Sequence, residues 1–289
     1  MTWFVLALLT AFFVASQDTW VKKYFSQTSV WDMIAFPLFY GLPLFLVVLF
    51  FVPFPKLDRT FYWSFLLSLP INGLGMIFYM KAIQISPLSL TIPYLAFTPT
   101  FMIPVGYLLL EELPDTWGVV GILVTCAGSY VLNMEKDHRS LLAPFKAIGR
   151  EAGSLLMLFV AFVYSFGAVV GKIAILHSSP LFFGVSFFFV FSLVILLPLF
   201  AFRKIQLPAL VREYKKGVVV GILYFFHIYC HSYAISMVKA AYMISIKRFS
   251  ILFSLVYGRL VFQEKNIAVR LAGSLLMISG AMLIVLAGR

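Results

Sequence analysis

Two adjacent cations, Lys247 and Arg248, lie in the middle of an apolar stretch, in the segment YMISIKRFSILFSL. A cation facing lipid there would be costly, so such residues usually face a cavity, pair with an acid or contact an anionic ligand. Arg offers planar, bidentate donors to carboxylate or phosphate groups, and Lys offers a compact point charge. We therefore predict that the pair binds an anion; the alternatives are that one or both side chains snorkel toward the headgroups or brace a kink.

A second polar pattern consists of Tyr224, His227 and His231, which share one face of a helix at spacing i, i+3 and i+7. Because histidine titrates near neutral pH, one interpretation is proton coupling, and the other is simple hydrogen bonding. The two histidines have the spacing of a metal-binding pair, but no nearby carboxylate or thiolate completes a zinc motif. We predict no metal ion and no cofactor.

Other polar residues inside apolar stretches are candidates for lining the same cavity. Tyr94 and Thr98, with Thr91, repeat the i, i+3, i+7 geometry in a separate segment. Asn72 lies in mid-stretch, where its amide could bond either a substrate or a neighbouring helix. We predict Tyr94, Thr98 and Asn72 as substrate-contacting residues.

Four charged residues are candidates for coupling or gating. Asp18 could form a local ion pair with Lys22, one helical turn away; alternatively it binds a coupling proton or neutralises Lys172. Glu112 and Glu264 each follow an apolar stretch at a turn, where capping or a gating contact is the expected role.

The composition predicts that membrane-spanning helices carry these side chains. Of 289 residues, 62% are hydrophobic and 11% charged, against about 45–50% and about 25% in soluble domains. The net charge of +11 resides mainly in short loops, where cations face lipid headgroups, so we predict membrane lipids and not nucleic acid as partners. Cys126 and Cys230 lie in apolar segments, which predicts packing and no disulfide framework.

Stretches with few charges recur at the roughly 20 residues that a helix needs to cross a bilayer. Because backbone groups in lipid must be paired internally, these stretches are expected to be helices. We predict an all-α integral membrane fold of ten transmembrane helices, near residues 3–20, 32–52, 61–80, 87–110, 115–133, 152–173, 180–202, 216–237, 240–262 and 267–287.

The two halves of the chain match each other when the sequence is shifted by 152 residues. The matching pairs are Ala82 and Ala234, Phe97 and Phe249, Phe101 and Phe253, Gly106 and Gly258, Glu112 and Glu264, Gly121 and Gly273, and Gly128 and Gly280. We predict a five-helix repeat in residues 1–133, a polar connecting loop in 134–150, and a second repeat in 151–289. Because each repeat has an odd number of helices, the two must be inverted in the membrane.

The distribution of cations gives an orientation. The odd-numbered loops carry most of the lysines and arginines, and the even loops carry only Lys56, Arg59, Lys172 and Lys239. The positive-inside rule therefore predicts that both termini lie outside.

Two segments, GYLLLEELPDTWGVVGILVTCAGSYVL and GRLVFQEKNIAVRLAGSLLMISGAMLIVL, each combine an apolar helix, a Glu at the turn and a glycine-punctuated helix. They resemble the end of an EamA repeat, and nearly the whole chain resembles the drug/metabolite transporter superfamily. The resemblance implies two inverted five-helix repeats around a cavity lined mainly by the first, third, fourth, sixth, eighth and ninth helices. It also implies cytoplasmic termini, in conflict with the cation count. Lys247 and Arg248 resemble the Lys-Arg pair of phosphate-exchanging plastid members.

Inverted repeats are typical of alternating-access carriers, whose substrate lies near the midplane. We predict a secondary-active exporter or exchanger of a small anionic or zwitterionic metabolite, not an enzyme, present as a monomer or homodimer in a prokaryotic inner membrane. The alternatives are an exporter of neutral or aromatic compounds or drugs, a membrane-embedded enzyme that uses His227 and His231 on lipid-linked substrates, and a non-transporting scaffold.

Overall fold

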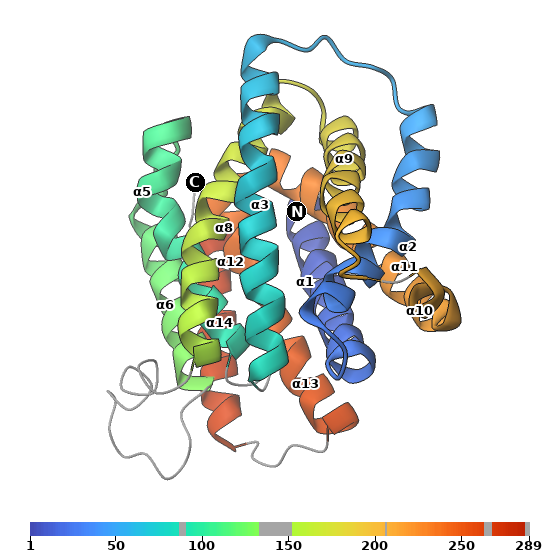
Figure 1. Cartoon of the computed structure of the whole chain (residues 1–289). Coiled ribbons are helices and arrows are strands. Elements are labelled where there is room, and N and C mark those ends of the chain that lie inside the picture. The colour runs from blue at the N-terminus through green and yellow to red at the C-terminus, as the bar shows by residue number, and fades with distance from the viewer. Residues whose placement is uncertain (87–90, 133–151, 206, 263–267, 287–289) are drawn as a thin grey trace.

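The computed structural model describes residues 1–86, 91–132, 152–205, 207–262 and 268–286, and all secondary structure in these residues is helical (Figure 1). The first half contains α1 (Thr2–Phe25), α2 (Val30–Phe51), α3 (Arg59–Ile85), the 3₁₀-helix η1 (Ile92–Phe97), α5 (Thr98–Leu110) and α6 (Thr116–Leu132). The second half contains α8 (Ala152–Leu176), α9 (Pro180–Ala201), α10 (Leu207–Arg212), α11 (Tyr214–Ser236), α12 (Ala240–Lys247), α13 (Ser250–Phe262) and α14 (Ala268–Leu286).

The helix starts follow from local sequence. Ser29 and Asp32 form a reciprocal capping box at the start of α2, and the Ser179 side chain accepts from Phe182 N–H at the start of α9. Asp58 caps α3 by accepting from the backbone N–H of Phe61 at 2.9 Å, and this hydrogen bond lowers the pKa of the Asp58 carboxyl. Each cap satisfies a backbone donor that a helix end leaves free.

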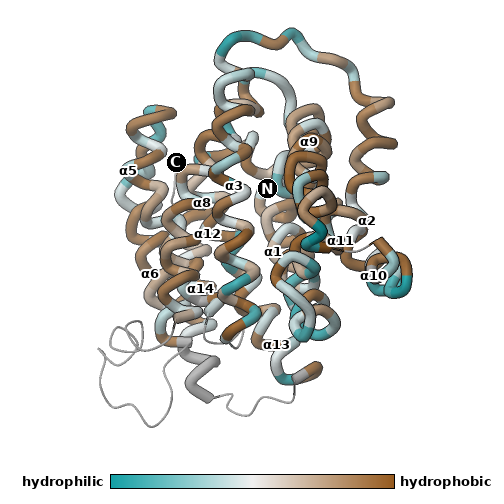
Figure 2. Tube along the Cα trace, viewed as in Figure 1, coloured by the Kyte–Doolittle hydropathy of each residue, from teal (hydrophilic) through white to brown (hydrophobic). Residues whose placement is uncertain are grey.

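Within the described residues, seven helices are long and apolar enough to cross a membrane, with α12 and α13 taken together as one span, Ala240–Val261. Three shorter apolar helices occupy Tyr94–Leu110, Thr116–Val131 and Gly273–Leu286. Hydrophobic residues follow the lengths of these helices, and hydrophilic ones concentrate at their ends and in the connections (Figure 2). The chain is thus a multi-pass integral membrane protein. Its connection after α9 also carries the short helix α10, which the sequence did not predict.

Two predicted helices, 87–110 and 240–262, are not continuous. In the first half the chain winds as a 3₁₀-helix over Ile92–Phe97 before α5 begins at Thr98. In the second half α12 ends at Lys247 and α13 begins at Ser250. Between them the backbone N–H of Phe249 donates to the carbonyl of Ile246, three residues earlier, as in a 3₁₀ turn. The 152-residue shift superposes Ile92–Phe97 on 244–249, so both repeats depart from α-helical winding at matching positions.

Glycines at the crossing of α6 and α14 relate the two halves. A Cβ added at Gly121 would lie 2.7 Å from the carbonyl oxygen of Gly280, and one at Gly128 would lie 2.8 Å from that of Gly273. Gly121 and Gly273 are repeat partners, as are Gly128 and Gly280, so each glycine of one repeat meets the non-equivalent glycine of the other. The two helices run antiparallel. A reciprocal contact of this kind is what a two-fold axis perpendicular to the helices produces. The repeats are therefore inverted.

The remaining helices also pack across the halves: α3 lies along α8, and α1 lies along α11. In the same way α5 packs against α8, and α13 packs against α1. Because each pairing joins one helix from each half, the space between the halves is surrounded by helices of both repeats.

We expect Gly121→Ala to destabilise the protein, because the added methyl group would force the backbones of α6 and α14 apart. Overpacking of this kind costs about 1–3 kcal/mol, which should lower the melting temperature of the detergent-purified protein by about 2 °C or more. Gly73→Ala is the control, since its Cβ would meet only side chains at ordinary contact distances, Ile195 at 3.5 Å and Phe191 at 3.9 Å. Equal melting temperatures for the two variants would contradict the close crossing.

Candidate functional site

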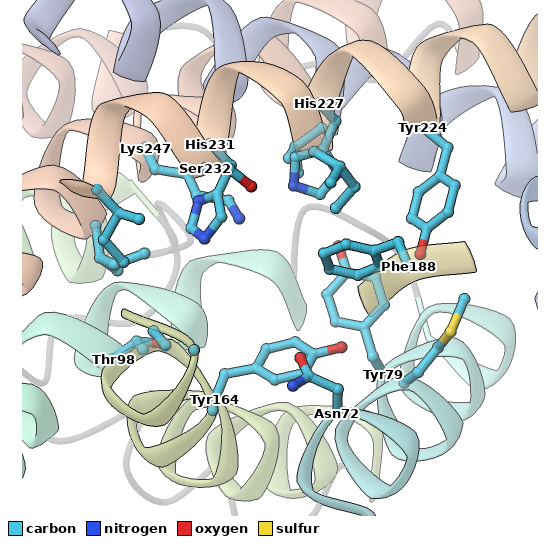
Figure 3. Close-up of a pocket in the computed structure, with 18 of the residues that line it drawn as sticks. Asn72, Tyr79, Thr98, Tyr164, Phe188, Tyr224, His227, His231, Ser232 and Lys247 are labelled. Carbon is cyan, nitrogen blue, oxygen red and sulfur yellow. The ribbon is translucent and has the colours of Figure 1, made fainter. Parts of the chain in front are cut away.

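A cavity of about 170 Å³ lies between the two halves (Figure 3). Its wall comes from α1, α3, η1 and α5, α8, α9, α11 and α12. The polar and charged side chains that line it are Gln17, Asp18, Asn72, Tyr79, Thr98, Tyr164, Lys172, Tyr224, His227, His231, Ser232, Lys247 and Arg248. The six helices implied by the EamA resemblance all contribute to this wall. The helix predicted at 180–202, which is α9, contributes to it as well.

Lys247 and Arg248 both line the cavity, at the break between α12 and α13. Arg248 is 4% exposed, so its guanidinium does not snorkel to a surface, and its Nε has no hydrogen-bond partner among the described residues. None of the ion pairs in the described part of the chain includes either residue. Two cations therefore face the cavity without a direct counter-ion, an arrangement that can receive an anion.

Asp18 enters the same cavity from α1, where it is 2% exposed and accepts a hydrogen bond from the Tyr79 hydroxyl. Its carboxylate interacts electrostatically with Lys247 and Arg248 across the cavity. The expected local ion pair with Lys22 does not form. Lys22 Nζ instead donates to the carbonyl oxygens of Ile83 and Ser86, and so satisfies the free end of α3.

Lys172 pairs with Glu112, and not with Asp18 as the alternative prediction had it. Lys172 Nζ also donates to the Val238 carbonyl at 2.7 Å, and Glu112 Oε2 accepts from the backbone N–H of Ala240 at 2.9 Å. This cluster joins the α5–α6 turn, α8 and the start of α12. Glu112 therefore has a capping role, as predicted, but the helix that it caps is α12, which lies far along the chain. Glu264, its repeat partner, lies outside the described residues.

The stripe on α11 faces the cavity: Tyr224, His227 and His231 lie along one side of that helix, opposite Tyr79, Tyr164 and Asn72 (Figure 3). Nδ1 of His227 lies 3.3 Å from Oε1 of Gln17, whereas His227 Nε2 and His231 Nδ1 have no partner in the described part of the chain. These free nitrogens can donate to or accept from a ligand.

Thr98 and Asn72 also line the cavity, but Tyr94 does not. Thr98 Oγ1 has no hydrogen-bond partner among the described residues, and Asn72 Nδ2 donates to the Ser68 carbonyl at 2.9 Å. Tyr94 is 7% exposed within η1, and the neighbouring Leu95 lines the cavity in its place. The prediction for Tyr94 assumed α-helical spacing, which the 3₁₀ winding with three residues per turn does not keep.

Several lining residues escaped the sequence analysis. From α9 come four phenylalanines, Phe183, Phe187, Phe188 and Phe191. The rings of Phe183 and Phe187 stack at 5.0 Å between centroids, and those of Phe187 and Phe191 at 5.8 Å, so they form a column along one face. The four-residue spacing of Phe183, Phe187 and Phe191 was the signal in the sequence that could have identified this face. Tyr164, on α8, packs where a Cβ on Gly75 would clash.

Comparison with known proteins gives three findings. The model of the EamA-like transporter family matches residues 1–134 and 151–286. A solved structure titled only as the crystal structure of a protein is similar over 97% of this chain and 98% of its own, with a TM-score of 0.71 and 14% sequence identity, which supports the fold alone. No curated protein matches the chain.

We expect Glu112→Gln to destabilise the protein, because Lys172 would remain buried without its counter-ion. The side chains are 4% and 22% exposed, and breaking a buried pair costs about 3–5 kcal/mol. The double variant Glu112→Gln, Lys172→Met should recover most of the loss in melting temperature. The exposed pair Lys216–Glu213 is the control: Lys216→Met should change stability by about 1 kcal/mol or less. A Glu112→Gln protein as stable as that control would contradict this role.

Proposed function

Because the chain belongs to the EamA-like transporter family, we propose that it is a secondary-active carrier of a small anionic or zwitterionic metabolite. In this proposal the chain crosses a prokaryotic inner membrane ten times. The substrate binds in the cavity between the repeats, and the two halves rock around it by alternating access. Transport is driven by a gradient or by exchange.

The observation that carries the proposal is the position of Lys247 and Arg248. Both face the cavity at a break in a membrane-spanning helix, where backbone and side-chain groups become available to a ligand. Burying a cation without a partner is costly, so an anionic group from a ligand would be strongly favoured there. Arg248 Nε and Thr98 Oγ1, both unpartnered in the described chain, add hydrogen-bonding capacity around the same site.

Two features favour alternating access. The crossing of α6 and α14 relates the repeats by a two-fold axis, so the long helices of one half have counterparts in the other. The matching breaks at Ile92–Phe97 and after Lys247 lie beside the cavity, where a change in winding would alter both the binding site and the contacts between halves.

The aromatic wall supports a second candidate, export of neutral or aromatic compounds. Phe188, Tyr224 and Tyr79 all line the cavity, so their rings could contact an aromatic ligand. Binding of a neutral compound would not explain why Lys247 and Arg248 face the cavity. A dry scaffold is less well supported, because the cavity is lined with unpartnered polar atoms.

We expect anions to raise the melting temperature of the purified wild-type protein through linkage between binding and stability. The same panel of carboxylates, phosphates, amino acids and neutral aromatics should lose its anionic responders in the variant Lys247→Met, Arg248→Gln. Lys215→Met, which removes an exposed cation on α11, is the control and should respond as the wild type does. Uptake into proteoliposomes then tests each responder as a substrate.

Stabilisation by neutral compounds alone, equal in the wild type and the double variant, would overturn the anionic part of the proposal. It would favour the aromatic candidate instead.

A further inference from the structure

The charged residues that line the cavity do not balance one another. Lys172 is compensated by Glu112, so it adds no net charge. Lys247 and Arg248 bring two positive charges, and Asp18 brings one negative charge. Among the described lining residues, one positive charge is therefore left without compensation. A proton passing from Lys247 to Asp18 would leave this total unchanged.

Asp18 is held in a fixed place within that set. The Tyr79 hydroxyl from α3 donates to its carboxylate, and Tyr164 from α8 lies close enough to interact electrostatically with it. Besides Lys172, the other titratable groups that line the cavity all come from α11: the Tyr224 phenol and the imidazoles of His227 and His231. Asp18 thus faces the cations of α12 from the opposite repeat without pairing with either one.

From this arrangement we propose that Asp18 sets the charge of the ligand, so that the carrier selects compounds with a net charge of −1. This inference rests on the proposed function, because it takes Lys247 and Arg248 as the anion site. A monoanion neutralises the remaining positive charge. A dianion would leave a negative charge without compensation in the cavity, beside the Asp18 carboxylate.

The physical basis is the strength of Coulomb interactions away from bulk water. In a partly desolvated site, two unit charges about 4 Å apart interact several times more strongly than they do in water. A second negative charge on the ligand therefore meets both a repulsive Asp18 and no free cation. The negative group of a zwitterion would be attracted to the cations. Because the zwitterion has no net charge, the excess positive charge of the cavity would remain.

The test measures dissociation constants by ligand-dependent melting for matched pairs that differ by one carboxylate, namely butyrate with succinate and benzoate with phthalate, at pH 8. We expect the monoanion of a pair to bind the wild type about tenfold more tightly than the dianion, or more. In Asp18→Asn, which keeps the side-chain size and removes the charge, we expect the preference to shift toward the dianion by about tenfold or more.

The matched control is Asp58→Asn, the same substitution at a carboxylate that caps α3 and does not line the cavity. It should lower stability without changing the ratio of dissociation constants. Asp18→Glu, which keeps the charge, should keep the preference for monoanions. If Asp18→Asn does not fold, a wild type that binds dianions as tightly as monoanions still overturns the proposal, and Asp18→Glu still tests whether the charge at this position keeps the preference.

The possible results separate the two levels of the hypothesis. Dianions that bind the wild type as tightly as monoanions, with binding lost in Lys247→Met, Arg248→Gln, would overturn the role of Asp18 and leave the anion carrier standing. An unchanged ratio in a folded Asp18→Asn would do the same. Anion responses that are absent, or that do not depend on the cations, would overturn the proposed function itself.

Discussion

The cost of holding two cations inside an apolar helix bundle is the constraint on which the site depends. Arg248 is buried and Lys247 lines the cavity, and no carboxylate pairs with either of them directly in the described chain. Three features reduce that cost: a cavity in front of them, the Asp18 carboxylate across it, and a helix break at their own position. Each feature also serves a carrier, because together they leave room and charge for a ligand.

A cavity between two halves requires the halves to be held firmly elsewhere. The crossing of α6 and α14 provides such a contact, since glycines at both crossing points let the backbones approach closely. The helices that line the cavity carry bulkier side chains and pair across the halves, α3 with α8 and α1 with α11. Close packing at one side of the bundle is therefore combined with space at its centre, and both are arranged by the same two-fold relation.

Periodicity and duplication in the sequence were sufficient to predict the long helices and the two repeats. Apolar length predicted the helices that are long enough to span a membrane, the 152-residue shift predicted two repeats, and charges in apolar stretches predicted Lys247, Arg248, Asp18 and Lys172, which line the cavity. It could not give the partner of each charge, because Glu112 and Lys172 are 60 residues apart and only the packing of the helices brings them together. Nor could it give the 3₁₀ winding near Tyr94, since that departure depends on tertiary contacts and moves the side chains that follow to new faces.

The two lysines at the ends of the bundle show how far the symmetry goes. Lys22 donates to the Ser86 carbonyl at the end of α3, and Lys172 donates to the Val238 carbonyl after α11; Ser86 and Val238 are 152 residues apart and so are repeat partners. Among the described residues, however, only Lys172 also has a carboxylate partner, Glu112, which in turn binds the start of α12. In both repeats, then, a lysine binds carbonyl oxygens at matching helix ends.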